Sequence, residues 1–361
     1  MTEDISYQRA AWKRLKKNKG AVFGLIVIFI TILVALFGYF IAPDHSPYAN
    51  RIIVEVGGRK PGSTQDFIRE KKDTIVEKAG FFQQLLYGQE DFYQYIPVTS
   101  YEDRADSIIA AVYVDEGLTQ RQAFAKSKLA DSPIYHARFL FGTDKSGRDI
   151  LSRIIIGTRI SLAVGLITVI ISLSIGLILG SLAGYYRGGK DAFILWFINV
   201  IWSIPTLLLV FAITLALGKG FWQVFVAVGL TMWVSVARLV RGQVLAAREL
   251  EYVEAARALG FSSFRIITRH IWPNIMGPVM VIAASNFAAA IIIESGLSFL
   301  GIGVQTPQPS WGLMIKENYN FIITNNPMQA LLPGFAIMLL VLAFNLLGNG
   351  LRDALNVRGK I

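Results

Sequence analysis

Residues 160–186 read ISLAVGLITVIISLSIGLILGSLAGYY, a run of 27 residues without a single Asp, Glu, Lys or Arg. The hydrocarbon core of a bilayer is ~30 Å thick, and a helix needs about 20 apolar residues to cross it. This run is therefore long enough to form a transmembrane helix. The whole chain agrees, because 53% of its 361 residues are hydrophobic and only 17% are charged.

Five further charge-free stretches bring the number of expected spans to six: 21–41, 192–218, 220–237, 270–293 and 318–351. The stretch 270–293 has two Pro near its start, and the stretch 318–351 is too long for one span. We therefore place their helices near 275–293 and 329–349. A seventh stretch, 295–315, contains four Gly and two Pro. A helix in contact with lipid must satisfy its own backbone hydrogen bonds, so we expect a loop there. The predicted fold is an all-α polytopic membrane protein with six transmembrane helices.

The distribution of positive charge predicts the orientation. Six Lys or Arg lie in residues 1–20, two in 187–191, six in 238–269 and three after residue 351, against only Lys219 and Lys316 in the short loops opposite. Cytoplasmic loops carry the excess of Lys and Arg. We therefore expect a multi-pass protein of the cytoplasmic (inner) membrane, with both termini in the cytoplasm. We interpret the net charge of +10 as a determinant of membrane orientation and of contact with anionic lipid, not as a sign of nucleic-acid binding.

The expected spans divide the chain into four parts. Residues 1–20 form a cytoplasmic N-terminal segment, 21–42 the first transmembrane helix, 43–140 an extracytoplasmic insertion, and 141–361 a transmembrane domain with helices 2–6. The first apolar run has 21 residues, more than the apolar core of a signal peptide, so we expect it to remain as an anchor.

The insertion has the charge balance of a water-facing subdomain, with 15 Lys or Arg and 16 Asp or Glu from Ala42 to Gly157. Its patterns predict a strand at 51–60 that ends in a Gly-Gly turn, a helical segment at 66–87 and a second amphipathic helix at 118–129. Two roles are open: contact with a delivered solute or partner, or a solvated spacer.

Enzyme chemistry is not indicated. The chain has no Cys and three scattered His, and each Gly-Lys pair lacks the Ser or Thr that a phosphate-binding Walker loop requires. We therefore predict no catalytic residue, no cofactor and no metal in this chain. A secondary transporter would need charged groups inside its spans, but spans two to six are charge-free apart from the boundary residue Glu294. A membrane-anchored receptor or scaffold is the remaining alternative class.

The most informative motif is Glu254-Ala255-Ala256-Arg257-Ala258-Leu259-Gly260. An apolar stripe of Leu250, Val253 and Ala256 predicts a short amphipathic helix, and Glu251, Glu254 and Arg257 form a second, charged stripe. Gly260 allows a chain reversal, and Pro273 marks the start of the next span. From these residues alone, a membrane-surface helix and a docking helix both remain open.

The spacing of this motif resembles the EAA loop of bacterial ABC importer permeases. That resemblance implies a coupling loop at about 249–272 that docks into a cleft of an ATPase subunit through Glu254, Ala255, Ala256, Arg257, Gly260 and Pro273. Two positions depart from the pattern: His270 stands for Ile and Trp272 for Leu. In the dipeptide/oligopeptide/nickel branch of the family, a His is frequent at the position of His270, so this departure resembles that branch.

Three further motifs resemble that branch: Phe141–Leu162 (GTDKSGRD, SR, GTRISL), Glu294–Gly312 (ESGLSFLGIG to PSWG) and Asn345–Leu355 (NLLGNGLRDAL). In the last, Asn349 replaces Asp, and Asn356-Val357 replace Asp-Pro. The chain is most similar to the C-type permease subunit of a peptide importer. The long insertion exceeds the usual loop of the family, so the resemblance implies no role for it.

The resemblance also implies partners. These are a second permease subunit of the B type, two ABC ATPase subunits that hold ATP and Mg, an extracytoplasmic peptide-binding protein and membrane lipid. The implied function is half of a translocation pathway for short peptides. Nickel or another small solute is the alternative cargo.

Two groups of candidate residues have open roles. The outer-mouth group, Gly142, Thr143, Asp144, Gly147, Arg148, Asp149 and Arg153, forms either a charge network that holds span two or a contact to substrate. The second group, Glu294, Ser298 and Phe299, lies either at the pathway or gate or in an inter-helix hydrogen bond. Pro205 is expected to bend span three.

Overall fold

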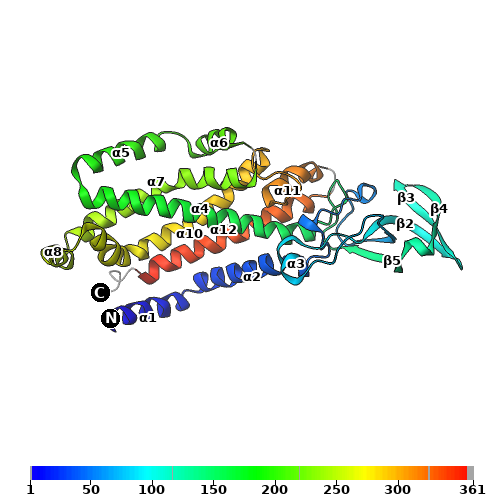
Figure 1. Ribbon diagram of the computed structural model, residues 1–361, viewed down its shortest axis with the longest axis horizontal. Coiled ribbons are helices and arrows are strands. Elements are labelled where there is room, and N and C mark those ends of the chain that lie inside the picture. The colour runs from blue at the N-terminus through cyan, green and yellow to red at the C-terminus, as the bar shows by residue number, and fades with distance from the viewer. Residues whose placement is uncertain (1, 116, 219, 324–325, 356–361) are drawn as a thin grey trace. The chain divides into compact units, whose positions relative to one another are not determined.

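The computed structural model describes residues 2–115, 117–218, 220–323 and 326–355 (Figure 1). Lys219, Arg358 and Lys360 of the charge count, and Asn356-Val357 of the last motif, lie outside the described residues. The chain divides into two compact units. Unit 1 contains Met1–Thr31, Ser161–Gln305 and Ile337–Ile361, and unit 2 contains Ile32–Ile160 and Thr306–Ala336.

Within the described ranges, five helical segments are long and apolar enough to cross a membrane: α2 (Lys19–Ile41), α4 (Ile150–Tyr186), α7 (Phe221–Arg248), Ser263–Phe299, which ends in α10 (Trp272–Phe299), and α12 (Met328–Leu355). A sixth span exists if the bent pair α5 (Gly188–Trp202) and α6 (Thr206–Leu217) counts as one. The six predicted spans fall on these elements. Helix α1 (Thr2–Lys17) precedes them.

The third span differs from its prediction as one continuous helix over 192–218. It is broken after Trp202 and resumes at Thr206, with a bend of 89°. Pro205 lies in the break, where its ring fixes φ and its nitrogen donates no hydrogen bond. The bend expected at Pro205 is thus confirmed, but it is sharp enough to divide the span into two helices.

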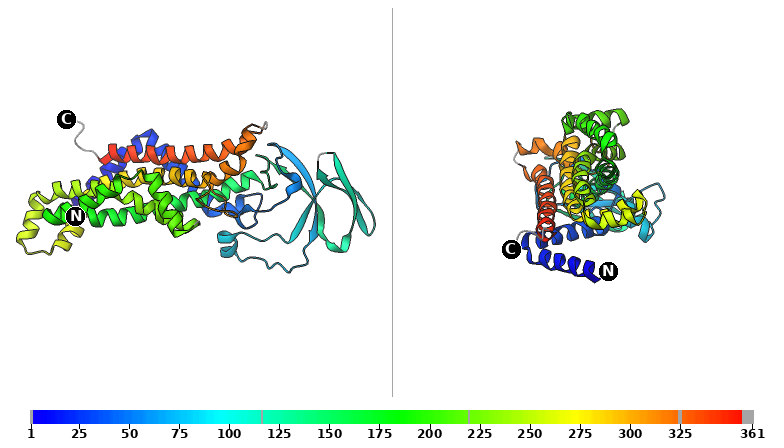
Figure 2. Two further views of the ribbon diagram at one scale, coloured as in Figure 1. Left: turned by 90° about the horizontal axis from the view of Figure 1, so that it is seen from above. Right: turned by 90° about the vertical axis from the view of Figure 1, so that its left-hand side faces the viewer.

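Helix α7 is the centre of unit 1 and contacts α5, α6, α8 (Glu251–Ala258) and α10 (Figures 1 and 2). Its approach to α4 depends on three glycines spaced four residues apart. A Cβ atom would lie 2.5 Å from the Val236 side chain at Gly176, 2.6 Å from a carbonyl oxygen at Gly180 and 2.8 Å from another at Gly184. Small residues at this spacing let two membrane helices pack backbone to backbone.

Unit 2 contains a five-stranded antiparallel sheet (Figure 2). Its strands are β1 (Ser63–Lys71), β2 (Tyr93–Asp103), β3 (Ser107–Asp115), β4 (Leu118–Ala125) and β5 (Leu129–Phe139), in the order β4-β3-β2-β1-β5. Neighbouring residues of β1 bury opposite faces: Ile68 packs with Val98 and Ile108, and Phe67 packs with Val56 and Phe139. Side chains alternate across a strand, so both faces of β1 carry a core.

The three local predictions for the insertion are wrong. Residues 51–60 contain a short 3₁₀ turn at Val54–Val56 instead of a strand, although a turn follows at the two glycines. Residues 66–71 belong to β1, residues 72–80 form neither helix nor strand, and only α3 (Phe81–Tyr87) is helical. Residues 118–129 form β4 and a 3₁₀ turn. Pairing with other strands of the sheet overrides the local helix preference of Gln, Arg, Lys and Ala.

The loop expected at 295–315 is shorter than predicted. Helix α10 continues to Phe299, and α11 (Trp311–Asn318) already occupies the last part of the stretch. An added Cβ at Gly296 would meet nothing within 4 Å, so this glycine is not required there for packing. The remaining loop, 300–310, carries most of the Gly and Pro residues. The other short elements are 3₁₀ turns at Pro47–Ala49, Lys126–Lys128 and Tyr319–Ile322, α9 (Ser263–Arg265) and a π-helical turn, η4, at Ile266–Ile271.

Candidate functional site

The EAA segment, residues 249–272, folds as a short helix on a buried base. Val253 and Ala256 of α8 are buried, and they pack in one cluster with Ile266, Ile267 and Ile271 of η4. Leu250 of the predicted stripe instead precedes α8 as its N-cap residue and is half exposed. The base is an apolar core, so it holds α8 in one position on unit 1.

The opposite side of α8 is open. Glu254, Ala255 and Arg257 are exposed, and no ion pair joins Glu254 to Arg257, although both are described. Two large apolar side chains next to them are also exposed, Leu259 at 72% and Phe264 at 77%. An exposed apolar patch rimmed by charges is typical of a protein interaction surface.

Gly260 ends α8 in a left-handed conformation. Its φ is +76°, the Phe261 amide donates to the Ala256 carbonyl at 3.1 Å, and the Gly260 amide donates to the Arg257 carbonyl at 3.0 Å. This pattern is a Schellman cap, for which glycine has no steric penalty. Pro273 lies in the first turn of α10, as predicted. Gly260 therefore sets the direction in which the chain leaves the exposed helix.

Three buried residues of the outer-mouth group, Asp144, Arg148 and Arg153, form a network of charges with Glu317, whose side chain is 11% exposed. We call these four residues the acid–base network. Arg148 donates from Nε to Asp144 Oδ2 at 2.6 Å and from Nη2 to Glu317 Oε2 at 2.9 Å. Arg153 donates to the same Glu317 oxygen at 3.1 Å, and its Nη1 lies 3.7 Å from Asp144. The side chains of both arginines are at most 4% exposed. The network ties the start of α4 to α11.

Gly142, Thr143 and Gly147 fit the 142–149 turn against the segment 53–59. A Cβ on Gly142 would collide with the carbonyl of Arg59, and one on Gly147 with the carbonyl of Ile53; both glycines have φ near +80°. Thr143 Oγ1 accepts from the Arg59 amide at 2.9 Å and donates to the Val56 carbonyl at 2.5 Å. These three residues therefore hold backbone positions that carry the acid–base network.

Asp149 caps the first turn of α4 and does not join the acid–base network. Its Oδ2 accepts from the Ser152 amide at 2.8 Å and from the Ser152 hydroxyl at 2.5 Å, and that hydroxyl accepts from the Asp44 amide at 2.9 Å. Burial raises the pKa of Asp149 above its usual range, although the two hydrogen bonds from Ser152 lower it. The nearby Asp44 adds to the increase, and Arg51 opposes it.

Glu294 and Ser298 lie together at the end of α10. Glu294 is fully buried, and its Oε1 accepts from Ser298 Oγ at 2.6 Å. The same hydroxyl accepts from the Val304 amide at 3.1 Å, so it joins the helix end to the returning loop. Phe299 is 44% exposed and takes no part in these bonds. The structure brings the first two predicted residues together and leaves the third apart.

Glu317 was not among the predicted site residues, yet it supplies two contacts of the acid–base network from a segment more than 160 residues away. Gln329, whose Nε2 donates to the Thr143 carbonyl at 2.6 Å, was not among them either. No local pattern marks either residue. In the described ranges, no group of three or more His, Asp or Glu side chains is placed to hold a metal ion.

A family model described as binding-protein-dependent transport system inner membrane component matches residues 176–360, slightly more than half of the chain. The chain belongs to this family. A second model, the N-terminal TM domain of oligopeptide transport permease C, matches residues 6–54 of the permease. The resemblance inferred from the EAA segment and the three other motifs is therefore confirmed.

Relatives extend this assignment. The glutathione transport system permease protein GsiD of Pectobacterium atrosepticum is 44% identical over 219 residues, which cover 61% of this chain and 72% of the relative. The dipeptide transport system permease protein DppC of Bacillus subtilis is 33% identical over 352 residues, 98% of this chain and 86% of the relative. A structure of the inward-facing MetNI methionine ABC transporter aligns with 55% of this chain and 94% of its own, at 19% identity and a TM-score of 0.46.

The permease is a multi-pass inner-membrane component of an ABC importer, and the ATPase activity of such systems lies in partner subunits. It is a transport component and not an enzyme.

Proposed function

We propose that the permease forms half of a pathway that imports short peptides. The printed functions of its relatives, glutathione and dipeptide transport, support this class of cargo. A second permease subunit of the B type completes the pathway, two ABC ATPase subunits bind ATP and Mg, and an extracytoplasmic binding protein delivers the peptide. Both termini and the EAA segment lie in the cytoplasm, and the insertion lies outside. The asymmetry of Lys and Arg supports this orientation.

One observation carries the coupling role: α8 is rigid at its base and open at its tip. Val253 and Ala256 anchor the helix in the core of unit 1, whereas Leu259, the C-cap of α8, and Phe264 of α9 are exposed; these two residues form the tip. A moving ATPase subunit transmits force only through an element that does not slide on its own base. We therefore assign Glu254, Ala255, Arg257 and the two exposed apolar residues to the ATPase contact.

Transport then follows from a difference in contacts between two states. When the ATPase subunits close on ATP, α8 moves with them and displaces α7 and η4, which pack against it. Such coupling requires that the contacts at the EAA segment differ between the outward-open and inward-open states. The Glu294–Ser298 pair at the end of α10 is assigned to the outer end of the pathway, where it holds the loop at 300–304.

The coupling role is tested with Gly260→Val and Glu254→Lys. The first places a β-branched residue at a φ of +76°, and the second reverses a charge on the exposed side. The expected result is loss of ATPase co-purification and of peptide uptake, with a normal amount of permease in the membrane. Gly242→Ala is the matched control, because that glycine has a helical φ in α7 and open space around its Cβ position. Unchanged ATPase association in both variants would contradict the proposal.

The orientation has its own test, which the absence of Cys from the chain makes simple. Ala105→Cys places a thiol in the exposed turn between β2 and β3, and Ala258→Cys places one on the exposed side of α8. A membrane-impermeant maleimide added to intact spheroplasts should label only the first variant. Labelling of only the second would reverse the topology.

A further inference from the structure

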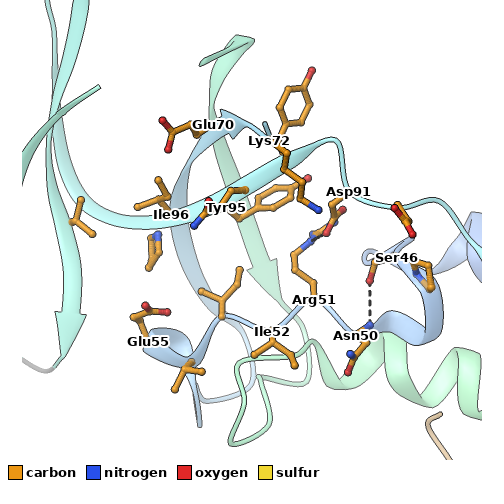
Figure 3. A pocket seen from close by; sticks show the side chains of 18 of the residues that line it. Ser46, Asn50, Arg51, Ile52, Glu55, Glu70, Lys72, Asp91, Tyr95 and Ile96 are labelled. Carbon is orange, nitrogen blue, oxygen red and sulfur yellow. Dashed lines mark hydrogen bonds and ion pairs between the residues drawn. The ribbon is translucent and has the colours of Figure 1, made fainter. Parts of the chain in front are cut away.

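The sheet of unit 2 carries a cavity with a volume of about 780 Å³ (Figure 3). It lies between the segment 46–55 and the strands β1 and β2, and β3 and β4 contribute Val112 and Gln122. Ligand pockets for small molecules measure about 300–1,000 Å³, so the volume suits a short peptide. The strands that form one wall lie outside both matched family segments, 6–54 and 176–360.

One side of the cavity is occupied by a fixed ion pair. Arg51 donates to both oxygens of Asp91, from Nε at 2.7 Å and from Nη2 at 2.5 Å, and its guanidinium lies 4.0 Å from the centre of the Tyr95 ring. Burial alone would lower the pKa of Arg51, but Asp91 and Asp44 raise it above the usual range. Arg51 and Asp91 therefore neutralise each other and form a rigid polar wall.

The charges that remain are mostly negative. The cavity is also lined by Glu55, Glu70 and Glu90, against Lys72 as the single other cation among its described lining residues. No ion pair of the described chain involves these three carboxylates. Figure 3 shows Glu55 and Glu70 on the side opposite Lys72 and the Arg51–Asp91 pair. That side of the cavity therefore has an unbalanced negative charge.

Apolar side chains complete the lining. Ile52 and Ile96 border the cavity together with the ring of Tyr95 (Figure 3). A pocket that combines an apolar wall with a few charged groups orients a ligand by its charge and binds its carbon skeleton by burial. An amino acid residue with a cationic group has both parts.

We propose that this cavity binds the ammonium-bearing end of a short peptide, either its N-terminus or a lysine side chain. Glu55 and Glu70 are the anionic partners, and Ile52 and Ile96 pack against the carbon chain. Lys72 is the opposing charge that limits affinity for strongly cationic peptides. This inference rests on the proposed peptide import and makes the insertion an acceptance site for cargo.

The test measures binding of trilysine, and of trialanine with and without an N-terminal acetyl group, to the full-length permease purified with its co-purifying subunits. The double variant Glu55→Gln/Glu70→Gln should bind trilysine about tenfold more weakly, since each exposed carboxylate contributes a few-fold. Lys72→Gln should bind it about two- to threefold more tightly, a change that partial unfolding cannot produce. Acetylation of trialanine should weaken its binding to the unmodified permease.

Glu102→Gln is the matched control, because Glu102 is an exposed carboxylate of β2 that does not line the cavity. It should bind trilysine like the unmodified permease. Equal affinity of the unmodified permease and the double variant, or an equal loss in the control, would overturn the inference. Uptake of trialanine in cells separates the two proposals: import without charge-dependent binding rejects the cavity alone, whereas no import of any peptide rejects the proposed function.

Discussion

The EAA segment and the acid–base network use the same residue types in opposite ways. In the network, both arginines and Asp144 are buried, Glu317 is 11% exposed, and the four charged groups pair with one another. In the EAA segment, Glu254 and Arg257 remain exposed on a helix whose apolar side is buried. A buried charge that loses its partner strongly lowers the free energy of unfolding, whereas a change of an exposed charge has little effect on it. The first region is therefore expected to determine stability, and the second to determine association.

The largest effect should come from Glu317→Gln. This change leaves Arg148 and Arg153 buried with Asp144 as their remaining carboxylate, which should cost about 3–5 kcal/mol and lower the thermal unfolding midpoint of the detergent-purified permease. Glu102→Gln removes an exposed carboxylate that pairs with Arg104, and its midpoint should not change measurably. Equal unfolding midpoints for the two variants would show that the buried charges of the network contribute no more to stability than an exposed ion pair does.

The next effect concerns the turn that supports the network. Gly147 and Gly62 both have φ near +80°, but a Cβ collides with the Ile53 carbonyl only at Gly147. Gly62→Ala should cost about 1 kcal/mol for its backbone conformation, and Gly147→Ala about 3 kcal/mol or more. The two unfolding midpoints measure the difference. If they agree, the close approach at Gly147 contributes nothing.

Within the EAA segment, substitutions at the base and at the tip should have different effects: the first on stability, the second on association with the ATPase subunits. Val253→Ala removes fully buried carbon atoms and should cost about 2 kcal/mol, whereas Leu259→Ala changes an exposed side chain and should leave the midpoint unchanged. Co-purification of the ATPase subunits should show the reverse order, with the larger loss in Leu259→Ala. An intact ATPase complex in Leu259→Ala would remove the tip from the contact surface.

The smallest effect should depend on pH. The raised pKa of Asp149 means that the folded state binds its proton more readily than the unfolded state, so Asp149 favours folding at low pH and this contribution is lost as pH rises through the raised pKa. Asn caps a helix as well as Asp does, without the cost of a buried charge. Asp149→Asn should therefore unfold at a slightly higher temperature at pH 7, and the gain should shrink as the pH falls towards 4. A gain that is constant with pH would contradict the assignment.

The membrane spans and the family could be predicted from the sequence. Charge-free runs of 18 or more residues place each span, because burying charge in lipid is expensive whatever the neighbouring helices are. The EAA helix followed from its local stripe, and its cap from Gly260. The four-residue spacing of Gly176, Gly180 and Gly184 in the sequence is also typical of a close contact between membrane helices.

Only the tertiary structure decided the insertion and the partners of the charged motif. Segments 66–87 and 118–129 have local patterns typical of helices, yet they contain strands. The more distant strands β2 and β5 supply the hydrogen bonds of β1. Strand β4 pairs with β3, which precedes it directly in the chain, but Phe124 of β4 is buried in a core that it shares with Ile68 of the distant β1. The role of Arg148 and Arg153 likewise depends on Glu317, which no local pattern places near them. A span needs only lipid around it, so its own residues determine it. A sheet or a buried ion pair needs a distant part of the chain, and only the folded protein brings that part close.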